Sequence, residues 1–299
     1  MTSPATALPQ ATSPAPTPAP ALAGLRAELD GIDDAIHDLL IQRAAVVERV
    51  ASEGGKGGVA IRPGREADIV RRLLARHAGR LPKRLIMRWW RELFAATTSM
   101  QGSYVVAVCE TEAGSPFTQA AREHFGALTP IRVHRSPSQA IAELSAGAAI
   151  CAVLPMPSDG ETAAWWTALL HRSTRPGDDP RIYIIARLPF WSPRPEGAPK
   201  VQALVVAAVA PDPSGHDRSI IGLELHTDAS RARLTAALTA AGLAPSATIL
   251  RRDPAATLAL VEVEGLVAED DPRLAALDGV VRRPVVLGAY AVPVDGETA

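Results

Sequence analysis

The chain has 299 residues, with 47% hydrophobic and only 4% aromatic residues, and a formal net charge of −1. Its length predicts two or three domains. Because a near-neutral chain creates no cationic field, nucleic acid is excluded as the main partner. No apolar run approaches the ~20 residues that a membrane span needs, so a membrane partner is not expected either.

Two local features of the composition are informative, namely the N-terminal tail and the two cysteines. Residues 1–20, rich in Pro, Ala and Thr, lack the basic and apolar regions of a signal peptide, and we expect a disordered tail. Cys109 and Cys151 lie in apolar, strand-like runs without metal-ligand or disulfide spacing. We interpret both as core thiols of a cytoplasmic protein and expect no metal site.

Residues 21–102 are predicted to form a helical domain. Apolar residues recur at three- and four-residue steps from Leu22 to Val50, and no proline interrupts the run. A first helix of about 30 residues should therefore end near the glycines of "EGGKGG". Proline at position 63 predicts the start of a second helix, ending near Gly79, and a third should run from Pro82 to Gly102.

The pattern changes after residue 102. Residues 103–198 alternate strand-like and helix-like runs, which predicts βαβ units and a largely parallel sheet. Residues 199–299 begin with a further strand-like run, and within them about 218–294 follow the βαββαβ order of a ferredoxin-like fold. The expected fold class is therefore an all-α domain followed by an α/β domain and an α+β domain.

An unusual number of arginines opens the second predicted helix. This cluster comprises Arg62, Arg65, Arg71, Arg72 and Arg76. Such a cluster is either a solvated helix face or a site for an anion. Arg43, close to the apolar stripe of the first helix, raises the same question, because a guanidinium near a core face usually has an anionic partner. Arginine binds carboxylates bidentately, so a small carboxylate ligand is one candidate.

Spacing along the helices limits how these residues can meet. Arg26 and Arg43 are 17 positions apart, which is ~25 Å along a helix. If both contact one small metabolite, they must come from different chains, which predicts an intertwined dimer. Thr97 and Gln101 are four positions apart on the third helix and share a face.

Three stretches together resemble the all-helical chorismate mutase domain: "LRAELDGIDDAIHDLLIQRAAVVERVA", "RPGREADIVRRL" and "WRELFAATTSMQ". The resemblance covers about 80 residues and implies the pericyclic rearrangement of chorismate to prephenate, in phenylalanine and tyrosine biosynthesis. That reaction needs no nucleophile, metal or organic cofactor. It needs an oriented substrate and positive charge beside the ether oxygen.

The resemblance also implies roles for individual residues. Arg26 would hold a substrate carboxylate in the partner's site, and Arg43 would hold one in its own chain. Glu66, next to Arg65, would accept a hydrogen bond from the ring hydroxyl, and Gln101 would face the ether oxygen. The implied catalytic and substrate-binding set is Arg26, Arg43, Lys56, Arg65, Glu66, Thr97 and Gln101.

One residue of that set departs from the family pattern. The lysine expected eleven positions after Arg43 falls on Gly54, and Lys56 lies two positions later. We take Lys56 as the residue that stabilises charge on the ether oxygen, provided that a shifted helix end delivers it. Loss of one such preorganised donor costs ~2.7–4 kcal/mol in comparable sites.

The rest of the chain resembles a prephenate dehydratase domain followed by an ACT domain, in the order of the bifunctional P-protein. The catalytic Thr-Arg-Phe motif of the dehydratase reads Pro180, Arg181, Ile182, and Thr174-Arg175 lies ahead of the strand-like run. Because proline has no hydroxyl to donate a proton, we expect this half to be inactive. The ligand motifs of the ACT domain read "DASRARL" and "LRRDP", and that segment stays a candidate site for an amino-acid effector.

Four functions are compatible with these patterns. The first is a chorismate mutase with a non-catalytic C-terminal half, and the second is a bifunctional mutase and dehydratase. The third belongs to another class, a non-catalytic sensor of aromatic-pathway metabolites. A lyase acting on isochorismate is a fourth, because it uses the same arginine scaffold.

Overall fold

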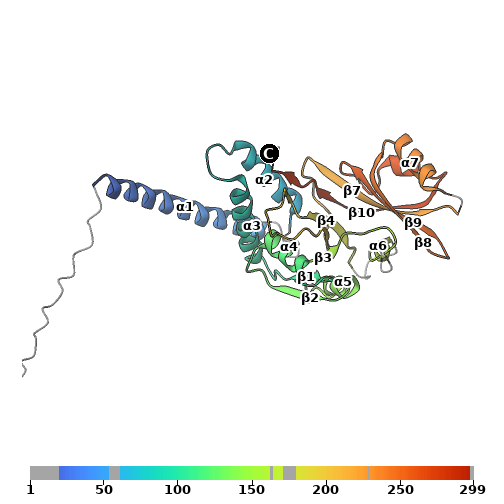
Figure 1. Ribbon diagram of the computed structural model, residues 1–299, viewed down its shortest axis with the longest axis horizontal. Coiled ribbons are helices and arrows are strands. Elements are labelled where there is room, and N and C mark those ends of the chain that lie inside the picture. The colour runs from blue at the N-terminus through green and yellow to red at the C-terminus, as the bar shows by residue number, and fades with distance from the viewer. Residues whose placement is uncertain (1–19, 54–60, 162–163, 171–179, 228, 297–299) are drawn as a thin grey trace, which may run out of the picture. The chain divides into compact units, whose positions relative to one another are not determined.

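The computed structural model describes residues 20–53, 61–161, 164–170, 180–227 and 229–296 (Figure 1). The chain divides into two compact units, residues 1–54 and residues 55–299.

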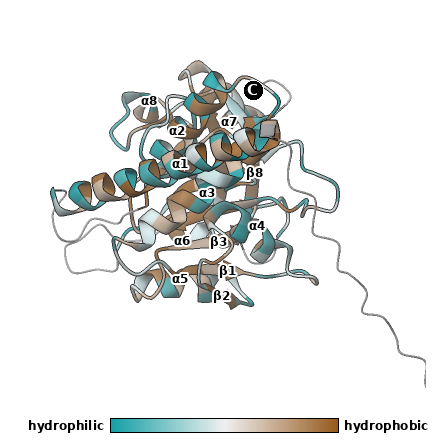
Figure 2. Ribbon diagram, turned by 90° about the vertical axis from the view of Figure 1, so that its left-hand side faces the viewer, coloured by the Kyte–Doolittle hydropathy of each residue, from teal (hydrophilic) through white to brown (hydrophobic). Residues whose placement is uncertain are grey.

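The first unit contains one long helix, α1 (Pro20–Glu53), which confirms the helix expected to stop before the glycines. Hydrophobic and hydrophilic residues alternate around α1 (Figure 2), as the three- and four-residue spacing requires. Its large apolar side chains are exposed, and they include Leu25, Leu29, Ile32, Ile36, Leu39, Val46 and Val50. A helix with such an open apolar stripe needs a partner surface.

The second unit begins with two helices, α2 (Pro63–Arg76) and α3 (Lys83–Ser99). Their starts agree with the predicted ones, because Pro63 lies in the first turn of α2 and Pro82 caps α3. The end of α2 comes earlier than the glycine at 79, since His77 is already extended and its N–H bonds to Leu74 O.

The remaining elements of the second unit are helices and strands in mixed order. The helices are α4 (Pro116–Phe125), α5 (Pro137–Ser145), α6 (Thr167–Leu170), α7 (Arg231–Ala240) and α8 (Pro272–Ala275). The strands up to the middle of the unit are β1 (Val106–Cys109), β2 (Ile131–His134), β3 (Cys151–Pro155), β4 (Tyr183–Leu188), β5 (Trp191–Ser192) and β6 (Ala203–Ala207). The later strands are β7 (Asp217–Leu225), β8 (Pro245–Arg252), β9 (Thr257–Glu264), β10 (Val281–Ala291) and β11 (Val294–Asp295).

Nine of these strands form one sheet in the order β2-β1-β3-β6-β4-β10-β7-β9-β8, and β11 pairs with β5 separately. The expectation of a largely parallel sheet is only partly right. Strand β1 is parallel to β2 and β3, but β6 enters antiparallel between β3 and β4. Sequence alternation located β6 but carries no information on its direction, which its pairing partners decide.

Two layers of helices cover the first part of the sheet, because successive side chains of a strand point to opposite faces. On one face, Val106 and Val108 pack in a cluster with Phe117 of α4. On the other face, Ala107 and Cys109 pack in a cluster with residues of α5. Cys109 and Cys151 are both buried and unpaired in disulfides, as core thiols should be.

The C-terminal part follows the βαββαβ order expected from the sequence. Its strands lie in the order β10-β7-β9-β8, all antiparallel, and α7 covers them (Figure 1). Leu234 and Leu238 of α7 are buried in a cluster with Ile221 and Val261. Strand β10 also pairs in parallel with β4, so this part continues the same sheet.

Candidate functional site

The first turn of α2 carries two of the predicted site residues side by side. Arg65 is exposed, and its Nη1 donates to Asp68 Oδ2 over 2.6 Å. Glu66 is half-buried, and its Oε2 accepts from Nη1 of Arg91 over 2.8 Å. The carboxylate predicted to receive the ring hydroxyl of a substrate is therefore held by an arginine of α3.

Arg91 is the site neighbour that sequence reasoning missed. Its side chain is only 4% exposed, and its guanidinium lies 4.8 Å from the centre of the Phe190 ring. The signal was present in the sequence, because Arg91 follows Met87 by four residues and precedes Phe94 by three, and both are buried. A charge at that spacing lies on the buried face and calls for an acidic partner.

Burial dominates the electrostatics around Arg91. It lowers the pKa of the Arg91 guanidinium, although the negative charge of Glu66 acts in the opposite direction. Burial, together with the positive charge of Arg91, holds the pKa of His124 well below its ordinary value. His124 is therefore neutral at pH 7, and its Nε2 lies 3.4 Å from Arg91 Nη1.

Thr97 lies in the last turn of α3, but the helix ends at Ser99 rather than near Gly102, so Gln101 follows the helix instead of sharing a helical face with Thr97 as predicted. The Thr97 hydroxyl donates to the Leu93 carbonyl over 2.8 Å, and Gln101 Nε2 donates to the Thr97 carbonyl over 3.2 Å. Thr97 follows Arg91 by six residues, which places it ~9 Å further along the helix axis. The structure thus brings Glu66 beside α3, whereas the Thr97 and Gln101 side chains bond to backbone carbonyls of α3.

The other predicted residues lie elsewhere in the chain. Arg26 and Arg43 both belong to α1, in the first unit, and the 17 positions between them fall within this one continuous helix. That continuity puts them ~25 Å apart along the axis. Gly54 and Lys56 lie outside the described residues, so the proposed shift of the lysine stays a prediction.

Within the arginine cluster, Arg65 bonds to Asp68 of the same helix, whereas Arg62 and Arg71 bind groups outside α2. Arg62 Nε donates to Asp212 Oδ2 over 3.1 Å. Arg71 donates to Ser214, to the His216 carbonyl over 3.0 Å and to the Val292 carbonyl over 2.6 Å. Arg62 and Arg71 therefore fit neither predicted alternative, a solvated helix face or an anion site. Their bonds tie α2 to the rest of the second unit.

Arg181, the arginine of the segment that resembles the dehydratase motif, also bonds to groups of the protein. Arg181 Nη1 donates to Glu269 Oε2 over 2.5 Å, and its Nη2 donates to the Val286 carbonyl over 3.0 Å. Its guanidinium lies 4.7 Å from the centre of the Tyr183 ring. Thr174 and Arg175 lie outside the described residues.

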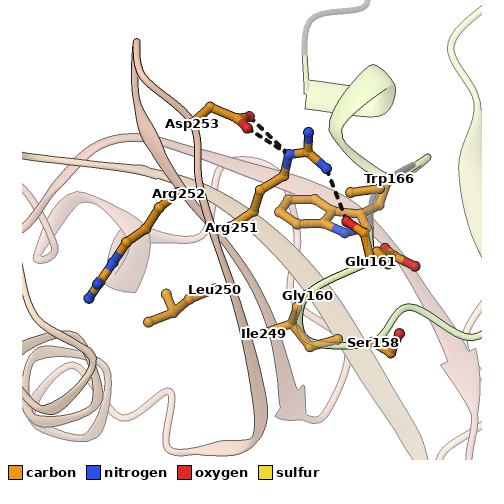
Figure 3. A pocket seen from close by; sticks show the side chains of 10 residues that line it. Ser158, Gly160, Glu161, Trp166, Ile249, Leu250, Arg251, Arg252 and Asp253 are labelled. Carbon is orange, nitrogen blue, oxygen red and sulfur yellow. Dashed lines mark hydrogen bonds and ion pairs between the residues drawn. The ribbon is translucent and has the colours of Figure 1, made fainter.

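A cavity of about 320 Å³ lies where the loop after β3 approaches β8 (Figure 3). Its lining includes charged and apolar side chains, among them Glu161, Trp166, Ile249, Arg251, Arg252 and Asp253. Arg251 Nε donates to Asp253 Oδ2 over 2.9 Å, and its Nη1 donates to the Glu161 carbonyl over 3.4 Å. Burial raises the pKa of the Glu161 carboxyl, against the lowering effects of a backbone hydrogen bond at Ser158 and the charge of Arg251.

The described residues contain neither a cluster of metal ligands nor a membrane-spanning helix. No three or more His, Cys, Asp or Glu side chains in this part of the chain gather as ligands for a metal ion. No helix within the same residues combines the length and apolar character needed to cross a bilayer.

Comparison with protein families defines the class of the helical segment. Residues 25–102 match the family model described as chorismate mutase type II. The N-terminal segment is therefore a chorismate mutase type II domain, placed ahead of the mixed α/β part.

Comparison with individual proteins concerns a longer part of the chain. Over 149 residues, this chain is 28% identical to the bifunctional chorismate mutase/prephenate dehydratase of Pseudomonas aeruginosa. The match covers 48% of this chain but only 40% of that relative, so the chain spans less than half of the curated protein that it matches.

Two solved structures are similar at low sequence identity. A prephenate dehydratase of Arthrobacter aurescens in complex with L-Phe has a TM-score of 0.47 at 12% identity, covering 62% of this chain and 90% of that one. GqqA, described as a novel type of quorum quenching acylase, has a TM-score of 0.45 at 16% identity, covering 64% and 96%.

Proposed function

We propose that this protein is a chorismate mutase, an isomerase that rearranges chorismate to prephenate in aromatic amino acid biosynthesis. The observation that carries the proposal is the family match over residues 25–102, which spans all of the residues assigned to the site. Arg65 and Glu66 stand together in the first turn of α2, as that chemistry requires. A cytoplasmic location belongs to the same proposal.

The residue types suit a reaction that depends on orientation rather than on a nucleophile. Chorismate has two carboxylates, and the arginines Arg43 and Arg65, with Arg26 of a second copy, offer bidentate partners for them. Holding the enolpyruvyl arm over the ring can contribute up to ~7–11 kcal/mol. Gln101 and Lys56 would supply hydrogen bonds and charge at the ether oxygen, with Thr97 beside them.

The active form that we propose is a homodimer. Arg26 and Arg43 lie ~25 Å apart along one continuous helix, which is too far for one small metabolite to bridge. The exposed apolar stripe of α1, with Leu25, Leu29 and Ile36 on it, provides the surface for a second copy. Arg26 would then enter the site of the partner chain.

We further propose that the C-terminal half has no dehydratase activity. Pro180 stands where the catalytic threonine would be and has no hydroxyl. Arg181, the surviving residue of the motif, is engaged by Glu269, by the Val286 carbonyl and by the ring of Tyr183. A bifunctional mutase and dehydratase is the competing proposal.

A small amino acid is the effector that we propose for the C-terminal half, at the cavity beside β8. Arg252 offers a partner for a carboxylate, Glu161 for an ammonium group, and Ile249 for an apolar side chain. If the protein turned over no substrate, this cavity would favour the non-catalytic sensor instead. Titrating aromatic amino acids into the purified protein by calorimetry, with Glu161→Gln as the comparison, tests this point.

One assay separates the main proposals. Purified protein is given chorismate, and its loss is followed before one aliquot is acidified and another left untouched. Acid converts prephenate to phenylpyruvate, so phenylpyruvate in the acidified aliquot alone supports a mutase without dehydratase activity. Phenylpyruvate in the untouched aliquot would establish a bifunctional enzyme, and unchanged chorismate would refute the mutase.

A further inference from the structure

A carboxylate from the C-terminal half caps the helix that carries Arg65 and Glu66. Asp212 lies between β6 and β7, and its Oδ1 accepts from the Gly64 N–H over 2.9 Å. Its Oδ2 accepts from the Arg65 N–H over 3.0 Å, and from Arg62 Nε over 3.1 Å. The residue at the N-cap position of α2, Arg62, makes no side-chain capping bond of its own.

The bonds from Asp212 replace the cap that α2 lacks locally. The first N–H groups of a helix have no partner within the helix, and a negative charge there is favoured by the helix dipole. Asp212 satisfies two of these groups with both of its oxygens, and its side chain is only 13% exposed. The first turn of α2 thus depends on a residue almost 150 positions away.

The packing around Asp212 leaves little freedom at this contact. A Cβ atom on Gly64 would overlap the backbone carbonyl of Asp212, so a side chain at position 64 would push the two segments apart. Further along α2, Arg71 donates to the Ser214 hydroxyl over 2.9 Å and to the His216 carbonyl over 3.0 Å. The segment that carries Asp212 is therefore held against α2 at two places.

We propose that Asp212 is a positioning residue for the isomerisation, so that the non-catalytic half orders the mutase site. The inference rests on the proposed function. Asp212 holds the backbone of the turn from which the side chains of Arg65 and Glu66 project. Because the reaction depends on the orientation of the bound substrate, displacement of this turn by ~1 Å can lower the rate by up to 10²-fold.

Two variants of the full-length chain test the proposal from opposite sides of the contact. Asp212→Asn keeps the size of the side chain but turns one acceptor into a donor facing Arg65 N–H and Arg62. Gly64→Ala leaves Asp212 intact and forces the segments apart. The control is Asp270→Asn, which removes an exposed carboxylate from a loop after β9. Steady-state kinetics with chorismate and amide hydrogen exchange without substrate are measured on all three.

The expected result in both test variants is a kcat/KM for chorismate lowered by about tenfold or more, with a raised KM, and faster exchange of the amides of residues 64–66. The control should match the wild type. Partial unfolding would lower kcat in proportion to the folded fraction and leave KM unchanged, so KM distinguishes positioning from stability.

The outcomes that would overturn the proposal differ from those that would overturn the function. Unchanged KM in both variants, with an active wild type, refutes the positioning role alone. A lower kcat that follows the folded fraction refutes it as well. A wild-type chain that leaves chorismate untouched refutes the proposed function, and the positioning role falls with it.

Discussion

Arg91 donates to Glu66 over 2.8 Å, and this bond joins the predicted ring-hydroxyl acceptor on α2 to a buried cation on α3. A substrate hydroxyl that bonds to Glu66 would meet a carboxylate whose position is already set by Arg91. Glu66 is thus oriented without help from the substrate.

Removing Arg91 should destabilise the fold. Arg91→Met leaves the half-buried Glu66 carboxylate without this cation, and breaking a buried ion pair typically costs ~3–5 kcal/mol. Urea unfolding at pH 7 should show a lower midpoint, whereas Arg88→Met, an exposed arginine of the same helix, should leave the midpoint almost unchanged. The double variant Glu66→Gln/Arg91→Met should recover part of the loss, and equal loss in single and double variants would contradict the pairing.

Two arginines of the helical segment, Arg43 and Arg72, should differ sharply in their effect on turnover. Arg43→Ala should abolish chorismate turnover, because a substrate carboxylate loses its bidentate partner. Arg72→Ala, on the exposed side of α2, should be nearly neutral. Chorismate loss measured at equal protein concentration decides the matter, and equal effects from both variants would undo the assignment of the site.

Complementation between two inactive variants should reveal the shared site. Arg26→Ala and Arg43→Ala should each be inactive, but a mixed dimer keeps one site with an intact Arg26 from one chain and an intact Arg43 from the other. Random pairing in a co-expressed sample restores about a quarter of the sites. Turnover near that level supports the intertwined dimer, while no recovery in a sample proven to contain mixed dimers would rule it out.

Acid should weaken the protein through His124. Its pKa is held well below the ordinary 6.5 by burial and by Arg91, whereas in the unfolded chain it returns to about 6.5. Below pH ~6.5 the unfolded state therefore binds a proton that the folded state does not. Stability falls with decreasing pH, by up to ~1.4 kcal/mol per pH unit from this group.

The variant His124→Gln should remove that contribution. Urea unfolding between about pH 7 and pH 5 should give a smaller slope of stability against pH than the wild type. His37→Gln, at an exposed position of α1, serves as the control and should keep the wild-type slope. A wild-type slope in His124→Gln would show that other groups set the acid sensitivity.

Much of the fold could be predicted because it depends on local rules. The starts of α2 and α3 follow from prolines at positions 63 and 82, and the length of α1 follows from its unbroken apolar spacing. The βαββαβ order of the last strands was equally readable. The direction of β6 could not be predicted. A buried strand has the same apolar sequence pattern whether its neighbours run parallel or antiparallel to it.

The sequence by itself determined the residue types at the candidate site, namely Arg43, Arg65 and Glu66 at spacings that suit a small dicarboxylate. Only the tertiary structure decided which charges are engaged within the protein. It pairs Glu66 with Arg91, and it brings Asp212, from the loop between β6 and β7, to the start of α2. Helical spacing encodes neighbours three and four residues apart, whereas these partners lie 25 and almost 150 residues away and meet only when the helices pack on the sheet.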